Sequence, residues 1–548
     1  MSTMQRTRGN CRGAVLVLAM IFLVIFSALA VAMATVSGSN VQVASNQHKV
    51  NGALHAAQSG LECAKYMVKT VTGLAQTNTN TVSDAQAAQT WNKLCTYVQT
   101  TQLDGKTVAA ASRFTDSLGS GDQLVTPALR MGVANAQFTI RFYRYDSGPR
   151  TIKMQATGTD GVASRRIGMD MAVTKDREVL NYAVSSRART WLAGDVTVHG
   201  NMYSAWKYQN ISPFHMTSDS KVLGRIGTIL DKVGPDLYAG SVKMPYDLET
   251  LDSDGDPVYD ASGHKVISYS DELQGQYEGI DYGVSYGDKA VNMPGMKITD
   301  YDTSQYKTQT TAIPSSSYNA LKVTEYMPHA TADYTKPGPS GGLKLTRYVC
   351  ENQTLTNALV ATNKNALFKN CTFNGILYVD GGRSGYYNNV RFDNCTFNGP
   401  IVTNPSTDTS SGWWQRNQLY FTGAATFQNQ TDVPATIMAP NFNVDIGNTN
   451  PTRSENNVLT GAIIGGIVDI RGHAQIYGTI ISMFDTSAYP SGYVSNIGAT
   501  LGDGGSETTD PGDVGVISIT PEQDKMLPSG ITSPIIIDPN DMTYSEAV

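Results

Sequence analysis

Residues 12–36 read RGAVLVLAMIFLVIFSALAVAMATV, and this stretch decides how the chain is organised. Between Ala14 and Val36 there is no charged residue, and Ser27 and Thr35 are the only polar ones. A helix needs about 20 mostly apolar residues to cross the hydrocarbon core of a bilayer. We therefore expect a single membrane-spanning helix over residues 14–36.

The basic residues around this stretch predict its orientation. Arg6, Arg8 and Arg12 precede it, whereas Lys49 is the first basic residue after it. The positive-inside rule then keeps residues 1–13 in the cytoplasm as a short leader. The bulk of the chain is expected on the other side of the membrane.

An amphipathic helix is expected to continue from the apolar stretch. Apolar residues recur with alternating spacings of three and four, Gln58, Glu62 and Lys65 fall between them, and no proline occurs before residue 75. We expect one helix over residues 14–75, with its second half packed on the next domain. The apolar positions are Leu54, Ala57, Leu61, Ala64, Val68, Val71 and Ala75.

Two general interpretations of this N-terminus stay open. One is a secretory signal cleaved after Ala32-Met33-Ala34, although the apolar run is longer than the roughly 7–15 residues of such signals. The other is a plain membrane anchor.

The N-terminus resembles that of type IV pilins and pseudopilins. The resemblance covers residues 9–75, and its most specific part is AAQSGLECA at residues 56–64, which is similar to the PilX-type N-terminal domain of minor pilins. It implies cleavage by prepilin peptidase after Gly13, which leaves Ala14 as the mature N-terminus. It also implies contacts with the bacterial inner membrane and with other pilin or pseudopilin subunits.

One position departs from the pattern of major pilins. Major pilins carry a glutamate five residues after the cut, where this chain has Leu18. A carboxylate in that apolar helix needs a partner, such as the terminal amine of a neighbouring subunit. Because the carboxylate is missing, we expect a minor subunit at a filament tip or base, or an anchored relative that does not polymerise.

Residues 76–176 are expected to form a pilin-like head. Trp91 and Leu94 mark a short helix, and alternating apolar residues predict strands at 137–144, 151–158 and 163–174. Turn-forming Gly, Pro and Asp residues lie between these strands, as in hairpins. The resemblance implies a long helix packed on such a small antiparallel sheet.

A repeat characterises the C-terminal half. Residues 368–375, FKNCTFNG, recur as FDNCTFNG at 392–399, an offset of 24 positions. This spacing suits one coil of a parallel β-helix, in which each side chain lies above its equivalent in the next coil. We expect a β-solenoid over residues 177–520. The pairs expected to stack are Phe373 with Phe397 and Asn370 with Asn394.

Two segments depart from this pattern. Residues 235–340 are polar, tyrosine-rich and interrupted by prolines, and are expected to be an irregular insertion. Residues 521–548 are expected to be a C-terminal cap or tail, because an uncapped coil exposes an open edge. The expected fold class is α+β and mostly β, a long helix with a small antiparallel sheet followed by a parallel β-helix.

Four aspartates form a candidate calcium site. Asp252, Asp254, Asp256 and Asp260 alternate along the chain, as oxygen ligands of a hard cation do. Pro257 stands where an EF-hand loop has glycine, and the glutamate of that loop is missing. A solvated acidic turn is the preferred interpretation of this pattern, and no other cofactor is expected.

Two patterns are compatible with an enzyme. Residues 283–287 match G-x-S-x-G, but no hydrophobic strand precedes Ser285. Asp469, Arg471 and His473 alternate and would share an outward face of a coil. Some β-helix enzymes cut acidic polysaccharides, but this chain lacks the adjacent aspartates that hydrolases of this kind commonly use.

Aromatic and sulfur-bearing side chains leave further alternatives. Trp413 and Trp414 either stack on a sugar or protein partner or fold back over a coil. Cys371 over Cys395 fits the strand spacing of about 4.7–4.9 Å that a disulfide tolerates, although a stacked pair of buried thiols is the preferred interpretation. None of the six cysteines forms a C-x-x-C pair, which removes the usual zinc and thioredoxin-like signatures.

These features together predict a non-enzymatic, single-pass protein of the bacterial inner membrane, with its N-terminus cytoplasmic and its bulk periplasmic or extracellular. It would assemble or decorate a type IV pilus or pseudopilus, and its solenoid would bind a surface glycan or protein. The net charge of -6 and the lack of a basic run beyond the N-terminus do not indicate nucleic acid binding. The alternatives are a surface-anchored β-helix polysaccharide lyase or hydrolase, and a structural envelope protein without a pilus role.

Overall fold

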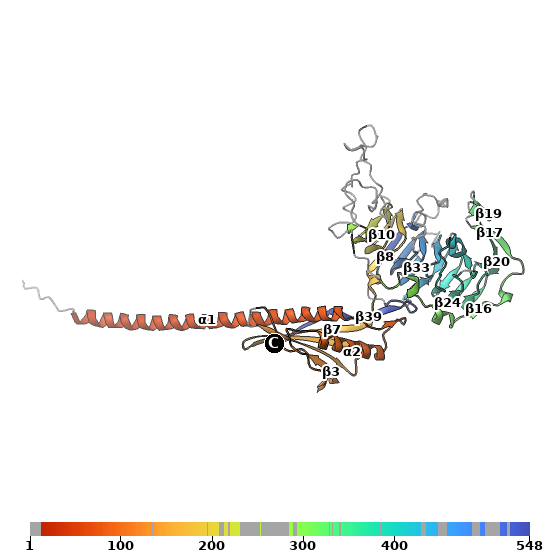
Figure 1. The fold of residues 1–548 in the computed structure, drawn as a ribbon. Coiled ribbons are helices and arrows are strands. Elements are labelled where there is room, and N and C mark those ends of the chain that lie inside the picture. The colour runs from red at the N-terminus through yellow and green to blue at the C-terminus, as the bar shows by residue number, and fades with distance from the viewer. Residues whose placement is uncertain are drawn as a thin grey trace, which may run out of the picture. The chain divides into compact units, whose positions relative to one another are not determined.

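A computed structural model describes residues 12–230 and 284–547, together with residue 253. Within these ranges the described residues exclude 133–135, 194, 208–212, 217–219, 286, 289–292, 328, 331–332, 339–340, 384, 411, 429–433, 448–456, 485–493, 499–515 and 523–525. The chain divides into two compact units (Figure 1). The head unit contains Met1–Ala75, Ser83–Thr174 and Ile536–Val548, and the solenoid unit contains Gln76–Val82 and Lys175–Ile535.

The first element, α1, is a single helix over Arg12–Thr70, which ends five residues before the end expected from the sequence. Its apolar first half is exposed on all sides. The hydroxyls of Ser27 and Thr35 donate to the carbonyl oxygens of Leu23 and Val31 at 2.7 Å, so both polar side chains are satisfied within the helix. In an apolar environment, where no water is available, a polar side chain needs such a hydrogen-bond partner within the protein.

The second half of α1 packs on the head sheet, as the amphipathic pattern predicted. Its buried residues are small near the start and larger further on: Ala53, Ala56, Ala57, Leu61, Ala64, Met67 and Val68. On the sheet, Gly158 lies directly beneath the helix, and a Cβ atom there would overlap the backbone of Ala53 and Ala57. The absence of a side chain at Gly158 therefore allows the helix and the strand to approach closely.

The head sheet is antiparallel and runs in the order β39-β7-β6-β5-β3-β2, with β1 beyond β39 and β4 on β5. Alternate residues of β5 and β6 are buried, which confirms the period-two pattern in the sequence. Helix α2, Asp84–Thr100, begins with a capping box at Ser83 and buries Trp91 and Leu94. The strands are β1 Gln76–Thr77, β2 Ser112–Asp116, β3 Gly119–Val125, β4 Leu129–Arg130, β5 Gln137–Tyr145, β6 Thr151–Asp160, β7 Ala163–Lys175 and β39 Ser533–Ala547.

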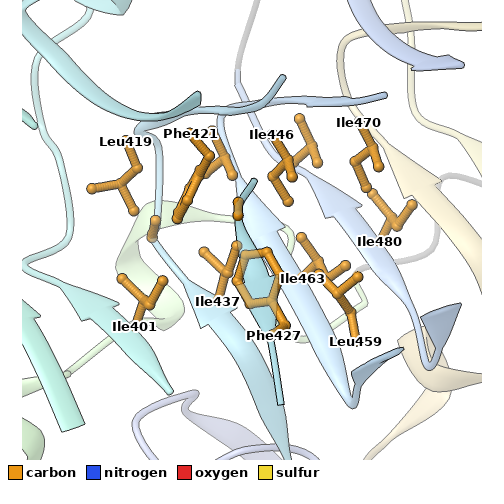
Figure 2. Close-up of a cluster of buried hydrophobic side chains, with 14 of the residues drawn as sticks. Ile401, Leu419, Phe421, Phe427, Ile437, Ile446, Leu459, Ile463, Ile470 and Ile480 are labelled. Carbon is orange, nitrogen blue, oxygen red and sulfur yellow. The ribbon is translucent and has the colours of Figure 1, made fainter. Parts of the chain in front are cut away.

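Parallel sheets surround one hydrophobic core in the solenoid unit, as the 24-residue repeat predicted (Figure 2). The largest follows the order β15 Val284–Ser285, β14 Ile226–Thr228, β11 Asn201–Ser204, β8 Tyr182–Ser186, β36 Ile480–Ser482, β33 Ala462–Gly465, β30 Ala435–Met438, β27 Ile401–Thr403, β24 Thr372–Val379, β22 Thr354–Val360 and β16 Thr311–Ala312. In the same sheet, β26 Thr396–Asn398 pairs with β24, and β29 Thr426–Phe427 pairs with β26. The second follows β12 Phe214–Met216, β9 Arg189–Ala193, β37 Val494–Gly498, β34 Ile467–Ile470, β31 Asn443–Ile446, β28 Asn417–Thr422, β25 Asn388–Asp393, β23 Leu367–Lys369 and β21 Val349–Glu351. The third follows β13 Lys221–Val222, β10 Val196–Val198, β38 Ile517–Thr520, β35 Ala474–Tyr477 and β32 Asn457–Thr460.

The order of the coils differs from a simple progression along the chain. The chain enters the stack at β8, in its middle, and winds outward to β15. It then begins again at the opposite end, at β16 and β22, and winds back until β36 pairs with β8. The solenoid is thus one continuous stack that the chain enters and leaves at the same level.

Part of the segment expected as an irregular insertion connects the two ends of the coil stack, from β15 to β16. Met293, Met296 and Tyr301 pack on the outer face of the largest sheet. Further along the segment, Lys307 forms an ion pair with Asp380 at 2.7 Å, and Thr311 pairs with Ala358. Three short helices lie along this path: the 3-10 helix η2 Ile298–Asp300, the α-helix α4 Ser304–Lys307 and the 3-10 helix η3 Ser315–Ser317.

The C-terminal residues correct one expectation. The sequence predicted a cap or tail of the solenoid at 521–548, but β39 forms part of the head sheet next to β7. The alternation in Ile535 and Ile537 suits any half-buried strand, so the local pattern did not identify the sheet that it joins. The head is therefore a discontinuous unit with the solenoid inserted between its last two strands.

Candidate functional sites

The predicted processing site lies at the start of the apolar helix α1. Gly13 and Ala14 lie in the first turn of α1, and a Cβ atom at Gly13 would meet no other atom within 4 Å. Leu18, one turn further on, is 58% exposed. Among the described residues, α1 is the one helix that is long and apolar enough to cross a membrane.

A groove of about 550 Å³ opens on the head between α1, β7 and β39. Buried Leu61 and Met169 supply apolar surface, and Lys65 lies at the rim between Glu62, at 3.5 Å, and Asp541, at 3.0 Å. The hydrogen bond to Asp541 raises the pKa of the Lys65 ammonium. The amphipathic pattern had assigned Lys65 to an exposed face, and the position of β39 explains why it is instead partly covered.

One surface of the solenoid presents a regular array of uncharged polar side chains. Thr354, Thr372, Thr396 and Thr426 pair in register on successive strands, and two residues further on the amide of Asn398 donates to Asn374 at 2.7 Å. Each of these positions is exposed or half-buried. The intervening Phe373, Phe397 and Phe427 point inward and stack with centroids 5.3 Å and 5.2 Å apart, which confirms the predicted stacking of Phe373 on Phe397.

Asn370 and Asn394, which were expected to stack in an asparagine ladder, lie at corners of successive coils and form hydrogen bonds with different partners. Asn370 and Asn394 both have positive φ, 49° and 52°, which asparagine tolerates at a corner. The Asn370 amide donates to Asn352 at 3.3 Å, and Asn394 accepts from the backbone of Ala424. These asparagines therefore hold the corners of successive coils by separate bonds.

A hairpin covers part of the second sheet. It consists of β17 Val323–Met327 and β20 Leu343–Arg347, with a second pair, β18 His329–Ala330 and β19 Asp333–Pro337, at its tip. Glu325 is 4% exposed and bonds Arg347 of the hairpin and Arg391 of β25, the latter at 2.6 Å. Burial acts to raise the pKa of Glu325, but the two guanidinium charges outweigh it and hold that pKa below its usual value.

The alternating set Asp469, Arg471 and His473 does not converge on a cleft in the described part of the chain. Arg471 forms a buried ion pair with Asp445 at 3.1 Å. Asp469 accepts from the backbone and side-chain nitrogens of Asn496, and His473 accepts from the backbone of Val516. Each side chain thus ties neighbouring coils together.

The tryptophan pair is folded back over a coil. Trp413 is fully buried in the short helix α5, Trp413–Arg416, and its ring stacks on Phe484 with centroids 4.3 Å apart. Trp414 is partly buried against the same cluster. These rings serve packing, and the alternative of an exposed pair is wrong for Trp413.

Two predicted sites remain, the candidate calcium ligands and the G-x-S-x-G pattern. Asp252, Asp254, Asp256 and Asp260 lie outside the described residues. Ser285 lies in the two-residue strand β15 and donates to Asp288 at 2.7 Å, where a nucleophile elbow would require a strand-turn-helix. Within the described ranges, no group of three or more His, Cys, Asp or Glu residues is arranged to hold a metal ion.

Two features were missed by the sequence reasoning. The threonine array was visible in the repeat, where Thr372 and Thr396 occupy the same position, but its extension to Thr354 and Thr426 falls in strands of weaker similarity. Glu325 and its partner Arg391 are 66 residues apart, and no local pattern signals their pairing.

Comparison with known proteins identifies the N-terminal region. Residues 12–62 match the family model described as PilX N-terminal. The solved structure of the competence-associated pilin ComZ from Thermus thermophilus matches at 11% identity, covering 91% of this chain and 97% of that chain, with a TM-score of 0.23. A search of curated proteins gave no match.

Proposed function

Because the chain carries a type IV pilin-like N-terminal domain, we propose that it is a minor pilin or pseudopilin-like subunit. In this proposal it occupies the tip or base of a type IV pilus or related filament and presents its solenoid as a binding surface. The observation that carries the proposal is the union of a PilX-type α1 and pilin-like head with an inserted solenoid. Its partners would be the inner membrane, prepilin peptidase and other pilin subunits.

The position of Leu18 favours a terminal subunit. Without a carboxylate in the first turns, α1 offers no ion pair to the terminal amine of a neighbouring subunit. An apolar helix still packs among other apolar helices through van der Waals contact. The chain would therefore join a filament without forming its repeating body.

The mature N-terminus tests the processing step. Mass spectrometry of the protein from cells with prepilin peptidase should give Ala14 as the first residue, and cells without the peptidase should give an uncut chain. Gly13→Val should block the cut, whereas the matched control Gly38→Ala should not, because a Cβ atom there also meets nothing within 4 Å. An N-terminus at Thr35, or an uncut chain in both strains, would contradict a pilin role.

Deletion of the chain tests the cellular role. We expect fewer pili, or pili that adhere less, and restoration by the complete chain but not by the Gly13→Val variant. Unchanged pilus number and adhesion would favour a structural envelope protein instead.

The solenoid is the proposed binding surface, and its threonine array, paired in register on successive strands, is the part that we propose to test. Thr372→Lys with Thr396→Lys would place two charges on this face without touching the core. Binding to immobilised surface glycans or proteins should fall by about tenfold or more, which corresponds to about 1.4 kcal/mol. Turnover of an acidic polysaccharide by the purified chain would instead identify the enzyme alternative.

A further inference from the structure

Three buried thiols lie at one end of the coil stack. Cys350 lies in β21, the outermost strand of the second sheet, and Cys371 and Cys395 occur in the next two coils. All three side chains are at most 1% exposed, and all three are free thiols. They belong to the coils that are furthest along the stack from the point where the chain enters and leaves it.

The backbone places Cys371 and Cys395 as direct neighbours. Each cysteine follows an asparagine with positive φ and precedes a threonine, and those threonines, Thr372 and Thr396, pair in register. The backbone N–H of Thr396 donates to the carbonyl of Cys371 at 2.9 Å. Adjacent strands lie about 4.7–4.9 Å apart, within the range of about 4.4–6.8 Å between the Cα atoms of a disulfide.

Cys350 is placed differently. It pairs in register with Phe368, three residues before Cys371, so its backbone is not the strand neighbour of Cys371. The thiol of Cys371 nevertheless donates to the carbonyl oxygen of Cys350 at 3.5 Å, and that of Cys395 donates to the carbonyl of Phe368 at 3.5 Å. The chain therefore offers Cys371 one partner in register and one on the diagonal.

We propose that Cys371 and Cys395 form a disulfide that links two neighbouring coils near this end of the solenoid. The thiolate of Cys371 attacks a sulfur of a disulfide oxidant, such as oxidised glutathione or an oxidising protein disulfide. This attack forms a mixed disulfide and releases one oxidant thiol. The thiolate of Cys395 then attacks the Cys371 sulfur, releases the second oxidant thiol and closes the bond, so two cysteine thiols are oxidised and one disulfide is reduced.

A disulfide between Cys371 and Cys395 would stabilise the coils near the end of the stack. A terminal coil has a neighbour on one side only, so it is the part of a solenoid that opens most easily. Because the thiols are buried, oxidation takes place while the coils are still apart or during such an opening. The bond then restricts the separation of the coils that carry Cys371 and Cys395.

The experiment uses the full chain in detergent, reduced first and then incubated with oxidised glutathione. After denaturation, free thiols are alkylated and the protein is digested with trypsin. Cleavage after Lys369, Arg383, Arg391 and Arg416 separates the two cysteines into peptides 370–383 and 392–416, whereas Cys350 lies in peptide 348–364. A linked pair of the first two peptides, lighter by two hydrogen atoms than their sum, is the expected product.

Matched variants keep the proposal falsifiable. Cys350→Ala should retain the linked peptides, whereas Cys371→Ala and Cys395→Ala should lose them. The thermal midpoint should rise on oxidation in the parent chain and in Cys350→Ala but not in the other two. Alkylation of both Cys371 and Cys395 after oxidation, or a link between peptides 348–364 and 370–383, would overturn the proposal.

Discussion

At the scale of single residues, Gly158 shows how closely helix and sheet approach in the head. Replacing Gly158 with Val inserts a side chain where the backbone of Ala53 and Ala57 lies, so the helix must move away from β6. We expect the free energy of unfolding of the head to fall by about 3 kcal/mol or more. Thermal denaturation would measure this change.

A second glycine provides the control for that prediction. A Cβ atom at Gly148 would meet nothing within 4 Å, so Gly148→Ala should leave the midpoint nearly unchanged. Equal midpoints for Gly158→Val and the parent chain would show that α1 does not pack on β6 as described.

Glu325 is the second residue with a large predicted effect. Its folded pKa is below the unfolded value of about 4.3, so the folded state binds fewer protons in this region. The resulting stabilisation is fully present above that unfolded pKa and is lost as the pH falls through the folded pKa. Glu325→Gln should therefore lower stability at neutral pH by about 3–5 kcal/mol, because two buried guanidinium groups lose their counter-charge.

Urea denaturation at several pH values checks this prediction. The parent chain should lose stability below pH 4–5 more steeply than Glu325→Gln does. The control is Glu351→Gln, which breaks an exposed ion pair with Lys369 at 3.5 Å and should change stability by about 1 kcal/mol or less. Identical pH profiles for the parent and Glu325→Gln would contradict the buried network.

At the scale of elements, the inward phenylalanines form the core of the repeat. Phe397 lies between Phe373 and Phe427, with ring planes inclined by 4° and 20°. Phe397→Ala should reduce the free energy of unfolding of the solenoid by about 3–5 kcal/mol, and Phe397→Leu by clearly less. Thr396→Ala, at the adjacent outward position, should cost about 0.5 kcal/mol or less in the same urea titration.

The same elements show what sequence periodicity can and cannot predict. The octets around Phe373 and Phe397, which match at all but one position, predicted the coil length and the stacking, because adjacent coils impose the same environment on equivalent residues. The hairpin at 323–347 was not predicted, because its position depends on the long-range contact between Glu325 and Arg391. Helix α1 was predicted nearly in full because its signal is local and continuous.

At the scale of the whole molecule, the coil order follows from contacts that no local pattern encodes. The seam where β36 meets β8 joins residues almost 300 positions apart, for example Ile480 and Val184. Short β-branched strands of this kind are interchangeable in pattern, so sequence alone did not distinguish a simple progression from a stack entered at its middle. The position of β39 was missed for the same reason.

This topology predicts that the head folds without the solenoid. The backbone N–H of Asp176 donates to the carbonyl of Pro534 at 2.8 Å, so the chain leaves and returns at adjacent points. A variant that replaces residues 178–531 with an Asn-Gly turn should keep a cooperative thermal transition and the helix and strand signals of the head by circular dichroism.

Truncation provides the contrasting variant. A chain that ends at residue 532 lacks β39, which leaves the edge of β7 unpaired and uncovers the groove beside Met169. It should aggregate or melt at a lower temperature than the version with the short turn. If instead the short-turn version is unfolded and the truncated one is stable, the discontinuous head is wrong.

The pairing of residues 76–82 with the end of the solenoid unit determines how the chain responds to a pulling force. They belong to the solenoid unit although α1 ends only shortly before them, and Gln76 and Thr77 pair with Pro534 and Ser533. A force that pulls on the solenoid therefore has a short route to α1 through these hydrogen bonds and a longer covalent route through β7 and the strands of the head. Hydrogen bonds yield before peptide bonds, so the short route releases first and the head sheet then takes up the load by extending.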